Sequence, residues 1–327
     1  MELNREDYLR IFNPILAERY QTLANEKFDL VHYTSASNAL RILNDQRVSL
    51  RNASLMNDFS EIDHGEKCIV EAWKSVHGRG NGQIPNGELF NLLHDISPVI
   101  FPAVEQTFDK VLHQRRIDSF LLSLAEHDEK SEGTLGRLSM WRAYGGRTNV
   151  ALVLNNFSET PDEASGAFTV PVTYSNFEQF STDHFPKLVA ALRDNIETLK
   201  CMSPDQIARA VSWTLHTLSI SIKHPGFSEE REWRILYAPW LISDDEIESR
   251  VVDIGGIPQK VFDLDLSPNR NTDRPWRQIP NLLKKVIIGP TEHPWVLYEA
   301  FVIELENLGI SDAGSKVIVS EIPIRRR

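Results

Sequence analysis

Short apolar segments separated by amphipathic ones are the feature that most limits what this chain can fold into. The runs "FLLSLA" (120–125) and "VALVL" (150–154) are almost unbroken in apolar residues, which is typical of strands buried on both faces of a sheet. Other stretches have the three- and four-residue apolar spacing of helices. Strands and helices alternate without a regular strand–helix–strand rhythm. The order therefore predicts an α+β fold with a mixed, largely antiparallel central sheet and helical insertions.

The spacing of apolar residues also predicts how the chain is divided into an N-terminal helix and one domain. Residues 1–28 carry one apolar stripe at helical spacing, so we expect an N-terminal helix there. Residues 29–327 then form a single α+β domain of a catalytic type, with helical insertions at about 62–116 and 181–222. With 41% hydrophobic and 25% charged residues, the chain of 327 residues has the composition of a folded globular protein.

Composition excludes several classes of protein. The apolar runs are too short to cross a bilayer, and the start "MELNREDYLR" has no apolar signal core, so we expect a cytoplasmic protein that does not meet a membrane. Two cysteines are too few for a disulfide framework, and the ten histidines lack the spacing of a metal site, so we expect no metal. A net charge of −11 argues against a general nucleic-acid coat protein.

Polar residues at the ends of predicted strands are the candidates for chemistry. The stretch "VHYT" puts His32, Tyr33 and Thr34 at the end of the first strand. A histidine beside a tyrosine is more often a hydrogen-bonded structural residue than a member of a binding site. Both interpretations stay open for this stretch.

Two further stretches carry the same ambiguity. "NDFSE" places Asn57 and Asp58 in a turn, with Glu61 at the spacing that completes a capping box at a helix start. In "SMWRAYGG", Trp141 and Tyr144 are three residues apart on one helical face. Such aromatic pairs pack into a core or form a binding surface.

The stretch "FSEEREWRIL" (227–236) raises the sharpest question. If its strand is regular, Glu230, Glu232 and Arg234 share one face. We expect the strand of "EREWRILYAP" to pair with that of "VVDIG". The alternation suits an exposed charged strand. However, the apolar residues that follow indicate a strand that becomes buried directly after its first residues. A carboxylate at the start of such a strand lies at the mouth of the sheet, which is a common place for a catalytic acid. Alternatively, Arg234 neutralises Glu232 in a structural ion pair.

These stretches, followed by "KKVIIGP" and "VIVSEIP", occur in an order and spacing that resemble a bacterial family catalogued as domain of unknown function 2971. The resemblance runs from about residue 30 to residue 323. Because that family was named for lacking an assigned activity, the resemblance implies a shared fold and no particular chemistry.

The first strand with its histidine, the helix and the short strand that follow are also similar to the opening of ADP-ribosyltransferase-like domains, above all the DNA-modifying toxins of toxin–antitoxin pairs. Those folds have a split sheet. The last motif of their active site is a glutamate on a late strand, often written Glu-x-Glu. The resemblance puts His32 at the first motif position. The middle position falls at Ser123, or at Trp141 and Tyr144, and matches no standard pattern of the family. The last position falls at Glu232 or Glu230.

The second resemblance implies a site that takes NAD as its substrate. A carboxylate would stabilise the positive charge that grows on the ribose, with Glu232 as the leading choice and Glu230 and His32 beside it. An aromatic ring would stack on the nicotinamide, and Arg234 or Arg51 would pair with the pyrophosphate. The full set implied for NAD is His32, Tyr33, Thr34, Arg51, Asn57, Asp58, Glu61, Ser123, Trp141, Tyr144 and Arg234.

Three functions follow as hypotheses. The first is an ADP-ribosyltransferase-like enzyme, a toxin or phage-defence effector, whose acceptor is nucleic acid or protein and which acts beside an antitoxin or other defence partner. The second is a non-catalytic module that binds a nucleotide or a protein. The third is a metal-free nuclease, which would need two catalytic histidines, whereas only His32 is well placed.

Overall fold

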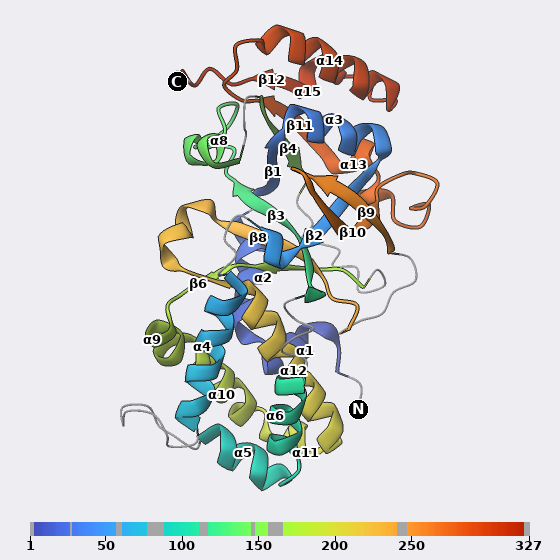
Figure 1. Ribbon diagram of the computed structural model, residues 1–327. Helices are drawn as coiled ribbons and strands as arrows, with labels where there is room; N and C mark the ends of the chain where they lie inside the picture. The colour runs from blue at the N-terminus through green and yellow to red at the C-terminus, as the bar shows by residue number, and fades with distance from the viewer. Residues whose placement is uncertain are drawn as a thin grey trace.

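A central sheet lies on top of a body of helices (Figure 1). A computed structural model describes the chain over residues 3–26, 28–56, 61–76, 88–110, 117–144, 148–155, 166–240 and 247–323. The predicted α+β class, with its mixed and largely antiparallel sheet, is confirmed: the one parallel neighbour pair of the main sheet in these ranges is β11 with β12.

The main sheet has ten strands, most of them in the order β12-β11-β4-β1-β3-β2-β10-β9, with β8 and then β5 on the other edge of β3. A separate two-stranded parallel sheet joins β6 to β7. The strands are β1 (Asp29–Ser35), β2 (Arg47–Asn52), β3 (Phe120–His127), β4 (Asn149–Leu154), β5 (Phe168–Pro171), β6 (Thr173–Tyr174), β7 (Ile222–Lys223), β8 (Glu232–Tyr237), β9 (Glu248–Ile254), β10 (Ile257–Asp265), β11 (Leu283–Ile288) and β12 (Val317–Val319).

The helices are α1 (Arg5–Phe12), α2 (Pro14–Glu26), α3 (Ala36–Asp45), α4 (Glu61–Val76), α5 (Glu88–Ile96), α6 (Ile100–Lys110), α8 (Leu138–Tyr144), α9 (Phe177–Gln179), α10 (Phe185–Asp194), α11 (Ile196–Lys200), α12 (Pro204–Ser221), α13 (Ile279–Leu282), α14 (Pro294–Asn307) and α15 (Ala313–Lys316). Shorter helical turns are η1 (Ala53–Leu55), η3 (Phe180–His184), η4 (Pro225–Glu230) and η5 (Pro275–Arg277). None of the helices in the described ranges is both long and apolar enough to cross a membrane.

The two helical insertions form one body. Helices α4 to α6 and α10 to α12 are far apart in sequence, yet their apolar side chains share a single core with α1. A second core lies between the sheet and the helices α3 and α14. Figure 1 shows the helical body beneath the sheet, with α14 on the opposite side. The division of residues 29–327 into one domain with insertions stays a prediction.

Two details of the predicted fold are wrong. The N-terminal stripe forms two helices, because the Asn13 side chain accepts a hydrogen bond from the Leu16 N–H (3.2 Å) and Pro14 begins the second helix. The strand of "EREWRILY" was also expected to pair with "VVDIG". Instead β8 pairs with β3 and β5, and β9 pairs with β10.

The sheet opens on one edge of β3, and we call this opening the fork. Strand β8 pairs with Phe120–Ala125 and so occupies one edge of β3. On the other edge, β2 pairs with Phe120 and Leu121, and β1 pairs from Ala125 onward. Beyond Val31, β1 leaves β3 and continues beside β4. No described strand therefore pairs with residues 122–124 on this edge.

Candidate functional site

A polar cleft of about 700 Å³ lies at the fork. Small-molecule sites are commonly concave and of this size. Its walls come from the end of β1, the start of α3, β2, the middle of β3, α8, the turn before β8 and the end of β9. The polar and charged residues that line it are His32, Tyr33, Thr34, Ser35, Ser37, Asn38, Arg41, Ser49, Arg51, Ser123, Tyr144, Lys223, Glu230, Glu232 and Asp253.

Ser123 joins the first and last strands of the predicted site. His32 Nδ1 lies 3.0 Å from the Ser123 carbonyl oxygen, and the Ser123 hydroxyl donates to Glu232 Oε1 at 2.6 Å. Because a carbonyl only accepts, Nδ1 carries the proton and Nε2 is left as an acceptor. Burial lowers the pKa of His32, so the ring is neutral at pH 7. Nε2 has no hydrogen-bond partner within the described part of the chain.

The carboxylate of Glu232 is saturated with hydrogen bonds. Oε1 accepts from Ser123 and from Arg234 Nε (2.9 Å), and Oε2 accepts from Lys223 Nζ (3.0 Å) and Arg234 Nη2 (3.2 Å). A carboxylate has about four acceptor sites, and these four bonds fill them. Burial alone would raise the pKa of Glu232, but the guanidinium of Arg234, the ammonium of Lys223 and the Ser123 hydroxyl outweigh it and lower the pKa to about 2. The side chain is a buried anion.

Glu230 has a different environment although it lies only two residues earlier. It ends the turn η4, Arg231 adopts the left-handed conformation (φ 44°), and β8 begins only at Glu232. The predicted regular strand from Glu230 onward is therefore wrong. The guanidinium of Arg137 fixes this turn, because it donates to the carbonyls of Glu229 (2.9 Å) and Glu230 (2.8 Å).

Each carboxylate oxygen of Glu230 accepts one hydrogen bond. The Tyr144 hydroxyl donates to Oε1 at 2.8 Å and Lys223 Nζ donates to Oε2 at 2.7 Å. Burial, together with the Glu230 charge, raises the pKa of Tyr144 and keeps its hydroxyl protonated as a donor. The side chain of Glu230 is 16% exposed and lines the cleft. Its oxygens thus retain acceptor capacity toward a ligand.

Two arginines from α3 and β2 also line the cleft. Arg41 on α3 donates to the Asn38 side chain at 2.7 Å, and Asn38 in turn donates to the Thr34 hydroxyl at 2.8 Å. Arg51 on β2 makes two long hydrogen bonds of 3.4 Å, to Gln259 and to the Leu55 carbonyl. The cleft lining therefore holds Arg41 and Arg51 as well as the glutamates, and we call these two arginines the cationic wall.

Several predicted residues have structural roles instead. Arg234 is 1% exposed, does not line the cleft, and donates to Glu232 and to the Ile220 carbonyl. It is therefore not placed to pair with a pyrophosphate. Trp141 is buried against Tyr33, with ring centroids 4.8 Å apart, and donates to the Leu135 carbonyl. It belongs to the core and offers no stacking surface.

Tyr33 and Thr34 reach the cleft but are already engaged. The Tyr33 hydroxyl accepts from the Arg137 backbone N–H at 2.9 Å, and burial raises its pKa to about 12. Asn57 and Asp58 of the predicted turn, and the side chain of Glu61, lie outside the described residues. The structure therefore brings together His32, Ser123, Tyr144, Glu230 and Glu232 in one cleft, which Arg51 also lines.

Sequence reasoning missed Lys223 and Arg41. Lys223 is a buried cation that bonds to both glutamates, and it lies in the two-residue strand β7 directly after α12, with no motif around it. Arg41 had a usable signal, since Thr34, Asn38 and Arg41 follow helical spacing from the predicted "VHYT" stretch. Within the described ranges, no three His, Cys, Asp or Glu side chains are grouped as metal ligands would be.

Comparison with known proteins adds one match. The model of a protein family of unknown function, DUF2971, matches residues 140–235. This segment includes Tyr144, Glu230 and Glu232 but not His32, and it is narrower than the predicted resemblance. Searches among curated proteins and among solved structures find no match. The ADP-ribosyltransferase-like split sheet stays a prediction. Over residues 140–235, less than a third of its length, the chain is thus similar to the DUF2971 family.

Proposed function

We propose that the cleft binds NAD and that the protein is an ADP-ribosyltransferase-like enzyme. The observation that carries the proposal is the meeting of His32 and the two glutamates at the fork, through Ser123 and Lys223. These groups come from separate strands and turns, and they line one cleft. A toxin or phage-defence role, with a nucleic-acid or protein acceptor, belongs to the same proposal.

Glu230 is the carboxylate that faces the ribose in this proposal. A ligand hydroxyl needs an acceptor with a vacant lone pair, and Glu232 has four bonds while Glu230 has two. Glu232 instead anchors Lys223, Ser123 and Arg234, and it acts as a positioning residue. This reverses the order of importance expected from the sequence, where Glu232 was the leading choice.

The cationic wall would take the pyrophosphate. Arg41 and Arg51 line the cleft, and a guanidinium presents a planar fork of donors to phosphate oxygens. His32 Nε2 is an acceptor at the fork and could receive a hydrogen bond from a ribose hydroxyl or take a proton from the acceptor molecule.

The reaction breaks the bond between the ribose C1′ and the nicotinamide nitrogen. Nicotinamide leaves as a neutral molecule with the electron pair of that bond, and the acceptor forms a new bond to C1′ and loses a proton. The transition state has positive charge on the sugar, so a nearby carboxylate stabilises it more than the ground state.

The test is to incubate the purified protein with NAD and to measure free nicotinamide by mass spectrometry. The proposal expects release that grows with time and is lost in the Glu230→Gln variant. The Glu229→Gln variant is the matched control, because Glu229 is exposed and does not line the cleft. The proposed enzymatic activity would be overturned if no nicotinamide were released with any acceptor offered, from water to single-stranded DNA and protein.

One observation favours a second candidate, a non-catalytic module that binds a nucleotide. Lys223 Nζ lies within 3.0 Å of both glutamates, and a cation there opposes the growth of positive charge on a sugar. Such a module would bind NAD or a related nucleotide in a calorimetric titration and release no nicotinamide.

A further inference from the structure

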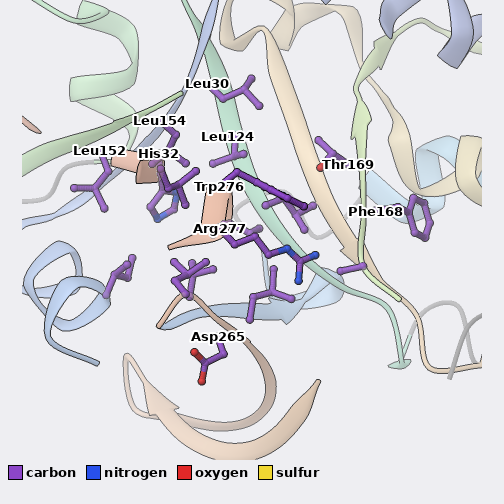
Figure 2. A pocket seen from close by; sticks show the side chains of 18 of the residues that line it. Leu30, His32, Leu124, Leu152, Leu154, Phe168, Thr169, Asp265, Trp276 and Arg277 are labelled. Carbon is purple, nitrogen blue, oxygen red and sulfur yellow. The ribbon is translucent and has the colours of Figure 1, made fainter. Parts of the chain in front are cut away.

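A second cavity, which is apolar, adjoins the polar cleft. It has a volume of about 120 Å³ and is lined by leucines from four strands, among them Leu30, Leu124, Leu152 and Leu154. Figure 2 shows these leucines together with Trp276 and Arg277 of η5, which also line the cavity. An apolar cavity of about 150 Å³ in another protein takes up a single benzene ring, so this one suits a hydrocarbon group of similar or slightly smaller size.

The cavity and the cleft share a wall at the fork. His32, Leu122 and Leu124 line both, together with Ile42 and Val48. The shared residues are those of the β3 edge that no described strand covers, and those of β1, α3 and β2 that face it. The two sites are therefore the two sides of one opening in the sheet, one polar and one apolar.

The charged residues that line the apolar cavity favour a negatively charged ligand. Arg5 and Arg277 line it, and the acidic residue there is Asp265. Asp265 is already engaged, because it accepts from the Ser267 N–H at 2.8 Å and lies 3.8 Å from Arg47. Both arginines also have contacts within the protein, but a guanidinium carries five donors and can add a carboxylate to them.

We propose that this cavity is a separate binding site for a small carboxylic acid with an apolar body. The hydrocarbon part would lie among the leucines and the carboxylate would meet Arg5 and Arg277. Charge complementarity selects the anion over a neutral or cationic molecule with the same chain. The site does not depend on NAD, and it goes beyond the function proposed above.

The experiment is isothermal titration calorimetry with straight-chain carboxylates from butanoate to octanoate, without NAD. Each added methylene should tighten binding about fourfold until the cavity is filled, after which affinity should level off. Hexanoate should bind at least about tenfold more tightly than hexylammonium or hexanol. Titrating without NAD separates failure of this site from failure of the proposed enzyme.

Two variants place the binding in the cavity. Leu154→Trp should fill the space and abolish hexanoate binding. Arg277→Gln should reduce the preference for hexanoate over hexanol, whereas Arg270→Gln, an exposed arginine outside this cavity, should not. If the tryptophan variant does not fold, the arginine pair decides alone. No saturable binding, equal affinity for acid and amine, or unchanged binding in a folded Leu154→Trp would each overturn the proposal.

Discussion

The turn that ends at Glu230 and the strand that begins at Glu232 are neighbours in sequence, yet they place their carboxylates in opposite situations. Glu232 is 6% exposed and its oxygens accept four hydrogen bonds. Glu230 accepts two and opens on the cleft. The left-handed Arg231 separates the two environments. One carboxylate is thus committed to the protein and the other is available to a ligand.

Depth of burial is therefore a poor guide to which carboxylate meets a ligand. A carboxylate inside a strand must be paired with cations and donors, because an unpaired buried charge costs several kcal/mol. Pairing consumes the lone pairs that a ligand would use. Glu230, two residues earlier, is held by Arg137 through its backbone carbonyl, and its carboxylate accepts two hydrogen bonds instead of four.

The largest expected effect is on stability. Glu232→Ala leaves Arg234 as a buried charge without its carboxylate, and we expect the free energy of unfolding to fall by about 3–5 kcal/mol. Glu230→Ala should cost only about 1 kcal/mol, because Lys223 keeps Glu232 as its partner. Urea unfolding of the two variants measures both values. Equal losses would contradict the division of roles.

The free energy of unfolding should also depend on pH in the acid range. The pKa of Glu232 is lowered to about 2 from an ordinary value of 4.5, so the folded state binds its proton less readily than the unfolded state. The stabilisation is complete above pH 4.5 and is lost as the pH falls toward 2, by about 3 kcal/mol for this group. Unfolding curves at several pH values should show this loss in the wild type and in Glu230→Gln. Glu232→Gln should lack that component of the loss.

A smaller effect is expected at the cationic wall. Arg51→Gln removes a cation from the wall that would meet the pyrophosphate, and NAD affinity should fall roughly tenfold. Arg47→Gln is the control, since Arg47 lies on the same strand, is exposed and does not line the cleft. Calorimetric titration with NAD compares the two. An equal loss in both variants would mean that the cationic wall does not select the ligand.

The smallest effect concerns the hydrogen bond that orients Glu230. Tyr144→Phe removes the donor to Oε1, and the free energy of unfolding should fall by about 1 kcal/mol. A loss as large as that of Glu232→Ala would show that Glu230 is as deeply committed to the protein as Glu232. Thermal unfolding measured side by side is sufficient to separate these cases.

Much of the fold was predictable because its strands are long apolar runs. The runs at β3 and β4 predicted buried central strands, and both lie inside the sheet. The ordered stretches "VHYT", "MWRAY" and "EREWR" also led to residues that line one cleft. The break at Asn13 escaped prediction because a capping asparagine inside an apolar stripe leaves the helical spacing intact.

The choice between the glutamates could not be made from the sequence. Alternation along a regular strand puts Glu230 and Glu232 on the same face, and nothing local shows that Arg231 adopts a left-handed conformation. Lys223 and Ser123 approach from other strands, so the bonds that saturate Glu232 depend on tertiary contacts. Arg234 was assigned to a ligand for the same reason.

The most direct test of the central claim is the rate of nicotinamide release by Glu230→Gln, measured beside Glu229→Gln and the wild type at a temperature where all three are folded. We predict that Glu230→Gln releases nicotinamide about 100- to 1,000-fold more slowly, as expected for loss of a group that stabilises transition-state charge. Glu229→Gln should match the wild type. A Glu230→Gln variant that keeps the wild-type rate would contradict the assignment of Glu230 as the carboxylate that faces the ligand.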